Sequence, residues 1–371
     1  MKAPLPRARG VSRRAFVTGL ASLPALGSAG KGRILPPDRV RYTDPATEFT
    51  LVRLTNPGYA SYLPPTTNAC ISRRGDFLIF ASERDGSLQA FRMEHKSGEW
   101  RQLTEASNLD RTSLLLAPDQ RSVYFADGAN VIALRLPGFR ERVVYRTPPD
   151  WTRTPGLAMT VDGLYLLQSE CSGSKSRLRL ISTARSSATT LVETEGEIES
   201  ILPRPGRAAV SYRRRGDDSL WLVDFGGKQN YRLQLNPGKV LAATWARDGR
   251  SLFYLQAPAE PGKLITLREF NPDTRSDALI GPTSQFVSFS RNADASVFVG
   301  ACGSKASPHV LLFLRSNKRE FTLCEHRASD PSQVMPVFDP SSERVYFQSD
   351  RDGKPAIYAI DVDRLVEKTE A

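Results

Sequence analysis

The amino-acid sequence predicts an all-β protein, a seven-bladed β-propeller closed by an N-terminal strand. The first observation behind this prediction is an internal repeat, in which a short turn leads into an apolar strand. The turn recurs at positions 76, 119, 162, 206, 249, 294 and 341, with spacings of 43, 43, 44, 43, 45 and 47 residues. Repeats of this length are typical of propeller blades. An open β-solenoid or two sandwiches would also repeat strands, but even spacing over seven units favours the propeller.

The second observation is that strands of the repeat are apolar on both faces. In the last unit, a tight turn at Gly353 precedes a strand with Ile357 and Ala359 on one face and Tyr358 and Ile360 on the other. A sheet with one face in water would alternate apolar with polar side chains. Sheets stacked between two neighbouring sheets bury both faces, as propeller blades do.

The third observation is a strand that has no blade of its own. Each full unit ends in a fourth strand, such as residues 100–104, but the seventh unit stops near Val366, too early for one. Residues 51–55 (Leu-Val-Arg-Leu-Thr) resemble that fourth strand and precede the first unit. We expect them to pair with the last blade as its outer strand, because this closes the ring and removes an open sheet edge.

The first 29 residues have the features of an export signal. They carry five basic residues and no acidic one, and Arg13 and Arg14 precede an apolar run from Thr18 to Leu26. The run is too short to span a bilayer as a permanent helix. The paired arginines resemble a twin-arginine signal, although an ordinary secretory signal is the alternative. We therefore expect a periplasmic or secreted protein with no membrane insertion after processing, divided into residues 1–29 (signal), 30–48 (lead-in) and 49–371 (propeller).

The charge of the chain is moderately basic. The formal net charge is +11, and removal of the signal leaves about +6, spread along every repeat. Nucleic acid is not expected as a partner of an exported protein. An acidic oligosaccharide suits both the compartment and the sign of the charge. The positive charge favours association with an anionic ligand but does not identify that ligand. Envelope proteins are the other class of partner that this compartment offers.

The chain has four cysteines, at positions 70, 171, 302 and 324, and one disulfide between them is possible. Cys302 and Cys324 fall in the same unit and could pair in an exported protein. A twin-arginine substrate folds in the reducing cytoplasm, however, and single cysteines on strands are usually small buried apolar residues. No CxxC motif or Cys/His cluster has the spacing of a metal site.

Several motifs resemble, in order, those of the oligogalacturonate lyase family. They extend over nearly the whole mature chain, at 41–45, 101–105, 116–119, 123–125, 220–223, 244–249, 323–326 and 348–358. The last motif, Gln-Ser-Asp-Arg-Asp-Gly-Lys-Pro-Ala-Ile-Tyr, is the strongest match, and TolB-type propellers share it. The resemblance implies a seven-bladed propeller whose relatives cleave short pectin fragments by β-elimination.

The resemblance also implies a catalytic site that this chain does not keep. In the family a histidine is the expected base for the proton α to the uronate carboxylate, and other histidines largely hold a manganese ion. The positions of those histidines fall here on Arg213, Ala242, Gln285, Gln333 and Met335. Ala242 offers no ligand, Met335 suits softer metals, and Arg213 would repel a cation. We therefore expect no manganese site and no other cofactor.

Five residues are candidates for ligand binding, and none is assigned as catalytic. They are Arg213, Tyr212, Gln285, Gln333 and His326, of which only His326 is a histidine at a position where the family also has one. A guanidinium at position 213 would pair bidentately with a uronate carboxylate. The plainer interpretation is that residues 213–218 form a salt-bridged hairpin.

The other two histidines are expected to have no catalytic role. His95 follows a strand in a surface hairpin and is expected to be solvated, and His309 begins a strand. Three functions then remain open. The chain is a metal-free relative of the lyases that binds acidic oligosaccharides, an active lyase with a substituted base (Arg213 or Tyr212), or a TolB-like propeller whose rims contact proteins.

Overall fold

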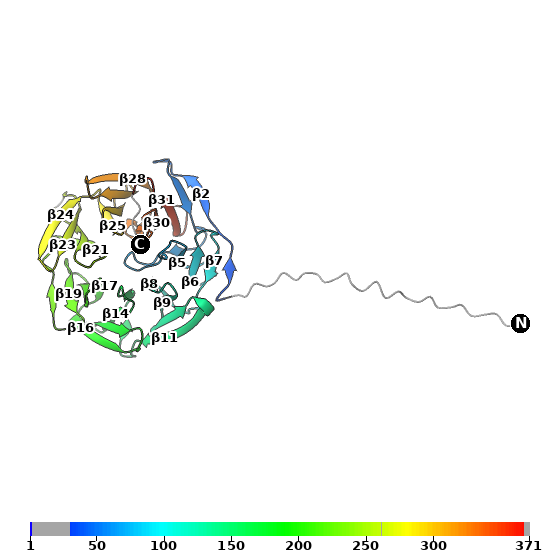
Figure 1. Cartoon of the computed structure of the whole chain (residues 1–371), viewed down its shortest axis with the longest axis horizontal. Coiled ribbons are helices and arrows are strands. Elements are labelled where there is room, and N and C mark those ends of the chain that lie inside the picture. Colours follow the sequence, from blue (N-terminus) through cyan, green and yellow to red (C-terminus); the bar gives the residue numbers. More distant parts are fainter. Residues whose placement is uncertain (2–29, 261, 367–371) are drawn as a thin grey trace.

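The computed structural model describes residue 1, residues 30–260 and residues 262–366. Within these residues, seven antiparallel sheets stand around a central axis as the blades of a propeller (Figure 1). The colours follow the chain around the ring, so that the last blade (red) lies beside the N-terminal strands (blue). The predicted seven-bladed propeller is confirmed.

The first three blades differ in how many short strands they add to the repeat. From the axis outward, blade 1 contains β4 (Ser61–Tyr62), β5 (Phe77–Ser82), β6 (Gln89–Glu94), β7 (Trp100–Gln102) and, outermost, β1 (Ile34–Leu35). Blade 2 contains β8 (Leu109–Leu116), β9 (Ser122–Asp127), β10 (Asn130–Arg135) and β11 (Arg140–Arg146), with the 3-10 turn η1 (Pro137–Phe139) before β11. In blade 3, the short β12 (Thr152–Arg153) and β13 (Ala158–Met159) both pair with β14 (Tyr165–Ser172), followed by β15 (Lys175–Ser182) and β16 (Ala188–Glu195).

The other four blades follow the same order. Blade 4 contains β17 (Ile198–Pro203), β18 (Ala209–Arg214), β19 (Trp221–Asp224) and β20 (Asn230–Arg232). Blade 5 contains β21 (Lys239–Trp245), β22 (Leu252–Ala257), β23 (Thr266–Asn271) and β24 (Ser276–Pro282). Blade 6 contains β25 (Phe286–Arg291), β26 (Val297–Cys302), β27 (His309–Leu314) and β28 (Arg319–Glu325). After the 3-10 turn η2 (Pro331–Gln333), blade 7 contains β29 (Val337–Phe338), β30 (Arg344–Ser349), β31 (Ala356–Asp361), β3 (Thr50–Arg53) and β2 (Val40–Thr43).

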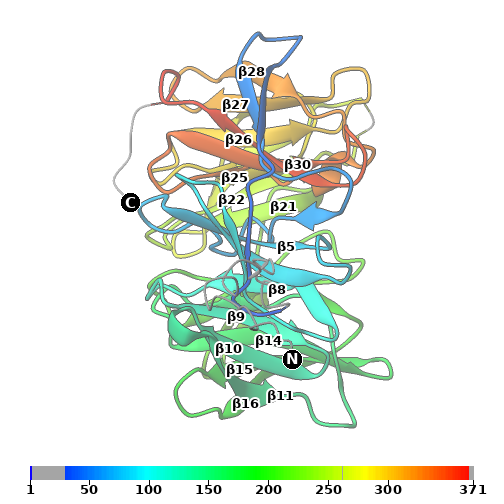
Figure 2. The same ribbon diagram turned by 90° about the vertical axis from the view of Figure 1, so that its right-hand side faces the viewer.

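The ring is closed by the N-terminal strand β3. It pairs antiparallel with β31, with Leu51 opposite Ile360 and Arg53 opposite Tyr358. This confirms the predicted closure, with one difference: β3 is not the outermost strand, because β2 pairs with its outer edge. The lead-in of residues 30–48, which shows little apolar periodicity, thus forms β1 on blade 1 and β2 on blade 7. Figure 2 shows this blue segment running along the rim of the ring.

The core lies between the blades rather than within one layer. In the described residues, seven clusters of buried apolar side chains fill the seven interfaces between neighbouring blades. For example, the ring centroids of Phe253 in blade 5 and Phe298 in blade 6 are 5.2 Å apart. All residues of β31 except Asp361 are buried, because each face of the strand contacts another blade. The apolar character of both faces is thereby explained.

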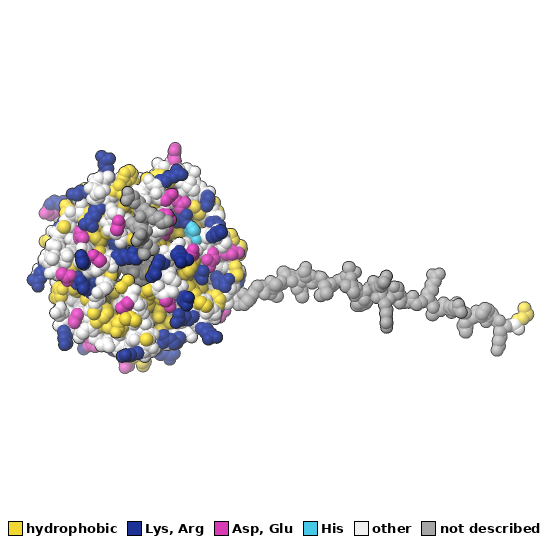
Figure 3. All heavy atoms as spheres, in the orientation of Figure 1, with side chains coloured by type: hydrophobic (Ala, Val, Ile, Leu, Met, Phe, Trp, Pro, Cys, Tyr) yellow, Lys and Arg dark blue, Asp and Glu magenta, His cyan; other side chains and the backbone are white. Residues whose placement is uncertain are grey.

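The outer surface carries charges of both signs. In Figure 3, Lys and Arg side chains are spread over the visible face of the ring, with Asp and Glu between them. No helix in the described part of the chain is long and apolar enough to cross a membrane.

Candidate functional site

A cavity of about 450 Å³ lies where the inner strands of the blades meet. Its wall takes residues from all seven blades, including Asn68 before β5, Thr112 in β8, Glu199 in β17 and Ser332 in η2. Each blade turns its innermost strand to the axis, so segments far apart in the sequence share one wall. The buried Ser288 hydroxyl on this wall has no hydrogen-bond partner in the described residues. A polar ligand or water would satisfy it.

The structure brings several of the sequence-derived positions together at this cavity. Arg213, Ala242 and Met335 line it, from blades 4, 5 and 7. Gln333 lines a neighbouring cavity of about 220 Å³. The two cavities are adjacent, because Ser332 and Thr112 line the larger one while the next residues in sequence, Gln333 and Arg111, line the smaller one.

Arg213 is held on the cavity wall by two neighbours. Its Nη1 donates to the Val240 carbonyl at 2.8 Å, and its Nη2 lies 3.5 Å from a carboxylate oxygen of Glu199. The second contact is longer than a hydrogen bond. Residues 213–218 do form a salt-bridged hairpin: Arg215 lies 2.6 Å from Glu197 and Arg232 lies 3.2 Å from Asp217. The plainer interpretation of this segment therefore holds, and the Arg213 side chain still faces the cavity.

Tyr212 points away from the cavity, into the interface between blades 3 and 4. It is fully buried, and its hydroxyl donates to the Asn230 side-chain oxygen at 3.0 Å. Adjacent residues of a strand face opposite sides of the sheet, so Tyr212 and Arg213 do not share a site. Burial raises the pKa of the Tyr212 hydroxyl.

His326 is completely buried and has both ring nitrogens engaged by the backbone. Nδ1 accepts from the Ala328 N–H at 3.0 Å, so Nε2 carries the proton and donates to the Cys302 carbonyl at 2.9 Å. Burial lowers the pKa of this imidazole, which favours the neutral ring. His326 therefore joins the ends of β26 and β28 and has no free nitrogen for a ligand.

Gln285 lies in the connection between β24 and β25. Its backbone has a positive φ of 58°, its N–H donates to the Thr283 carbonyl, and its carbonyl accepts from Gly303, both at 2.8 Å. Gln285 is not among the residues that line the two cavities. The structure thus places it at the rim of blade 6.

His95 corrects one expectation from the sequence. It does lie in the turn after β6, but its ring is half-buried against blade 7 rather than solvated. A ring nitrogen contacts the Arg344 guanidinium, and Nδ1 lies 3.2 Å from the Tyr346 hydroxyl. The imidazole of His95 is buried because closure of the propeller brings β30 beside this turn. His309 begins β27, as predicted, and all four cysteines are unpaired.

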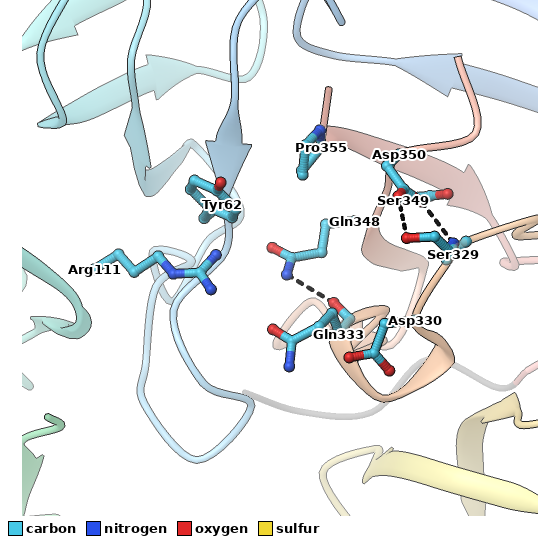
Figure 4. Close-up of a pocket in the computed structure, with 10 residues that line it drawn as sticks. Tyr62, Arg111, Ser329, Asp330, Gln333, Gln348, Ser349, Asp350 and Pro355 are labelled. Carbon is cyan, nitrogen blue, oxygen red and sulfur yellow. Dashed lines mark hydrogen bonds between the residues drawn. The ribbon is translucent and has the colours of Figure 1, made fainter. Parts of the chain in front are cut away.

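The smaller cavity contains an arginine that sequence reasoning missed. The guanidinium carbon of Arg111 lies 3.8 Å from the ring centroid of Tyr62. Both side chains face the cavity, across from Gln333 and Gln348 (Figure 4). Gln348 is fixed by accepting from the Leu63 N–H and donating to the Gln333 carbonyl, each at 2.7 Å.

Two carboxylates on the far side of this cavity already receive hydrogen bonds. Asp350 accepts from the backbone N–H of Ser329 at 2.8 Å and from its hydroxyl. Burial alone would raise the pKa of Asp350, but the hydrogen bonds from Ser329 outweigh it and lower the pKa. Asp330 caps η2 and accepts from the Ser332 N–H at 3.0 Å and hydroxyl at 2.7 Å.

The repeat register would have indicated these lining residues. Eight positions before the turn of each unit, five of the seven equivalent residues line a cavity: Asn68, Arg111, Ile198, Leu241 and Gln333. Equivalent positions of a repeat occupy equivalent places around the ring. Of these five, Arg111 alone is a charged residue.

The comparisons with known proteins agree with this architecture. A family model described as oligogalacturonate lyase matches residues 29–172. An oligogalacturonide lyase from Pectobacterium atrosepticum is 23% identical over 387 residues, covering 88% of this chain and 97% of that protein. The chain is similar to oligogalacturonate lyases over most of its length. A TolB homologue from Chlorobium chlorochromatii is 28% identical over 131 residues, 35% of this chain, so both resemblances seen in the sequence are confirmed.

A solved structure of an oligogalacturonate lyase in complex with manganese has the same fold. Its TM-score is 0.84 at 20% identity, and the match covers 90% of this chain and 98% of that one. In the present chain, the cavity wall offers hydroxyl groups, the Asn68 amide, the Glu199 carboxylate and the Met335 thioether. No group of three or more His, Cys, Asp or Glu side chains that could hold a metal is found among the described residues. Manganese favours carboxylate and carbonyl oxygens, and this wall offers one carboxylate, that of Glu199.

Proposed function

We propose that this chain is an exported propeller that binds acidic oligosaccharides, such as pectin fragments, at the central cavity without a metal. The similarity to oligogalacturonide lyases supports the ligand class, since their name states an acidic oligosaccharide as substrate. The cavity supports the place, because it lies at the axis and all seven blades contribute residues to its wall.

The observation that carries this proposal is the position of Arg213. Arg213 lines the cavity, and its Nη2 has only the long contact of 3.5 Å to the partly exposed Glu199. A ligand carboxylate can replace such a loose partner and form two parallel hydrogen bonds with the guanidinium. Ser288 lines the same cavity, and its buried hydroxyl has no hydrogen-bond partner among the described residues.

Binding is favoured here over β-elimination by the chemistry of the two residues considered as substitute bases. The Tyr212 hydroxyl is buried away from the cavity and donates to Asn230. A guanidinium is a donor only and offers no lone pair to accept a proton. Among the residues that line the cavity, Glu199 alone offers a carboxylate, and none is a histidine.

Export remains part of the proposal on the strength of the sequence alone. Arg13 and Arg14 lie outside the described residues, as does the apolar run that follows them. A periplasmic or secreted protein would meet pectin fragments in its own compartment, which makes the two parts of the proposal consistent.

Calorimetry with digalacturonate in the presence of a chelator tests this function. We expect binding, and Arg213→Ala should weaken it by about tenfold to a hundredfold, since a charged hydrogen bond contributes roughly 1.5–3 kcal/mol. Arg215→Ala is the matched control, because Arg215 is in the same hairpin but pairs with Glu197 and does not line the cavity.

Three results would contradict the proposal in different ways. Absence of binding would favour the TolB-like interaction propeller. Formation of the unsaturated uronate product, followed by its absorbance, would favour an active lyase. Stoichiometric manganese in the purified protein would overturn the metal-free part.

A further inference from the structure

The strongest further feature is the Arg111 guanidinium in the smaller cavity. It is half-buried and stacked 3.8 Å from the Tyr62 ring centroid. Within the described part of the chain, its side chain has no hydrogen bond and no ion pair. Other partly buried arginines nearby are paired: Arg153 lies 2.7 Å from Asp110, and Arg177 lies 2.7 Å from Glu170. A half-buried guanidinium without a counter-ion favours an anionic ligand.

The carboxylate nearest to Arg111 in sequence is already fully engaged. Asp110 accepts from Arg153 Nη1 at 2.7 Å, from the Gly156 N–H at 2.9 Å and from the Thr112 N–H at 2.9 Å. Burial would raise the pKa of Asp110, but these partners lower it, which keeps it ionised and committed to them. Asp110 therefore orients the strand beside Arg111 and leaves the guanidinium to the cavity.

The opposite wall provides partners for hydroxyl groups. The Gln333 side chain is exposed and makes no hydrogen bond to a described residue, and the Asp330 carboxylate can accept further hydrogen bonds. The cavity thus presents a cation and an aromatic ring on one side and amide and carboxylate oxygens on the other (Figure 4). A sugar acid matches this pattern, because it carries one carboxylate and several hydroxyl donors. A simple inorganic anion would leave the acceptors on the far wall unpaired.

We propose that Arg111, stacked on Tyr62, forms a second carboxylate-binding subsite, separate from Arg213. The inference rests on the function proposed above and extends it. The two arginines belong to different blades, 2 and 4, and to adjacent cavities. One ligand carboxylate pairs with Arg213 and another with Arg111. An oligomer long enough to contact both arginines therefore gains a second charged contact.

The test is calorimetry with galacturonate, digalacturonate and trigalacturonate on the wild type and on Arg111→Gln. We expect the wild type to bind at least one oligomer about tenfold to a hundredfold more tightly than the monomer. Arg111→Gln should bind the oligomers no more tightly than the monomer, while its affinity for the monomer stays unchanged. Arg140→Gln is the matched control, because Arg140 is exposed on β11, the outer strand of the same blade.

A second pair of variants keeps the test decisive if Arg111→Gln unfolds. Tyr62→Phe keeps the aromatic face and should retain the tighter binding of oligomers, whereas Arg111→Lys keeps the charge but not the planar, bidentate group and should lose most of it.

Equal loss of monomer and oligomer affinity, or no loss at all, would overturn the subsite. If the wild type binds the monomer as tightly as the oligomers, the subsite is wrong and the proposed function stands. If the wild type binds none of the three sugars, the proposed function fails as well.

Discussion

The Arg84 guanidinium lies 3.1 Å from the Asp38 carboxylate, and this contact fastens the N-terminal lead-in to the first blade. Arg84 also donates to the Pro36 carbonyl at 3.0 Å and stands 4.5 Å from the Trp100 ring centroid. Since β1 pairs with blade 1 while β2 and β3 pair with blade 7, the lead-in crosses the seam where the ring closes. Closure therefore depends on two connections, the predicted strand and the lead-in.

Removal of these N-terminal strands should weaken the ring stepwise. A protein that begins at residue 55 loses the ladder between β3 and β31 and exposes a long sheet edge, so it should unfold more easily by roughly 3 kcal/mol or more and aggregate. A protein that begins at residue 44 lacks β1 and β2 but keeps β3, and should be intermediate. Urea unfolding and size-exclusion chromatography, with a protein beginning at residue 30 as reference, measure both effects. Equal unfolding midpoints for all three would refute closure by these strands.

His326 should contribute to stability and not to ligand binding. His326→Ala removes a buried ring and leaves the Ala328 N–H and the Cys302 carbonyl without their partner, at an expected cost of about 2–4 kcal/mol. His309→Ala, at the less buried start of β27, should change the unfolding free energy by less than about 0.5 kcal/mol. Loss of sugar binding by a folded His326→Ala protein, at a temperature well below its melting point, would contradict a purely structural role.

Stability should fall in mild acid because of His95. Burial is the largest cause that lowers the pKa of His95, and the Arg344 charge lowers it further. The other charged groups that act on this ring are Asp361, Arg39 and Asp339. The unfolded imidazole has a pKa of about 6.5, so the unfolded state binds more protons below that pH. The contribution is therefore present above about pH 6.5 and is lost as the pH falls toward the lower folded pKa.

Urea unfolding of the wild type and of His95→Gln at pH 7.5 and pH 5.5 checks this sign. The loss of stability between the two pH values should be smaller in His95→Gln, because glutamine cannot take up the proton that places a second cation beside Arg344. An identical loss in both proteins would show that folding does not lower the pKa of His95.

Export by the twin-arginine route predicts a specific defect. Arg13→Lys combined with Arg14→Lys keeps the charge of the signal but removes the paired guanidinium groups, so the precursor should stay in the cytoplasm. Immunoblots of cytoplasmic and periplasmic fractions measure the ratio of precursor to processed protein. The positions lie outside the described residues, so the test depends on the sequence alone. Normal processing of the double variant would leave an ordinary secretory signal as the better interpretation.

The number of blades and the closing strand could be determined from the sequence. A blade is built from consecutive hairpins, so its signals are local: a turn at each of the seven positions and strands such as 356–360 that are apolar on both faces. The strand at 51–55 was identifiable because it resembles residues 100–104 and has no blade of its own. The structure places Arg213, Ala242 and Met335, three of the positions singled out by the resemblance, at one cavity.

The contacts between blades were decided only by the tertiary structure. Arg111 and Tyr62 belong to different blades, and His95 meets Arg344 from the other end of the chain, so no local pattern records either pair. The lead-in formed strands because the edges of blades 1 and 7 offered backbone partners, although its own sequence has little periodicity. The physical reason is common to all three: the strand pattern is set by neighbours in sequence, whereas ring closure sets which distant side chains share a cavity or a seam.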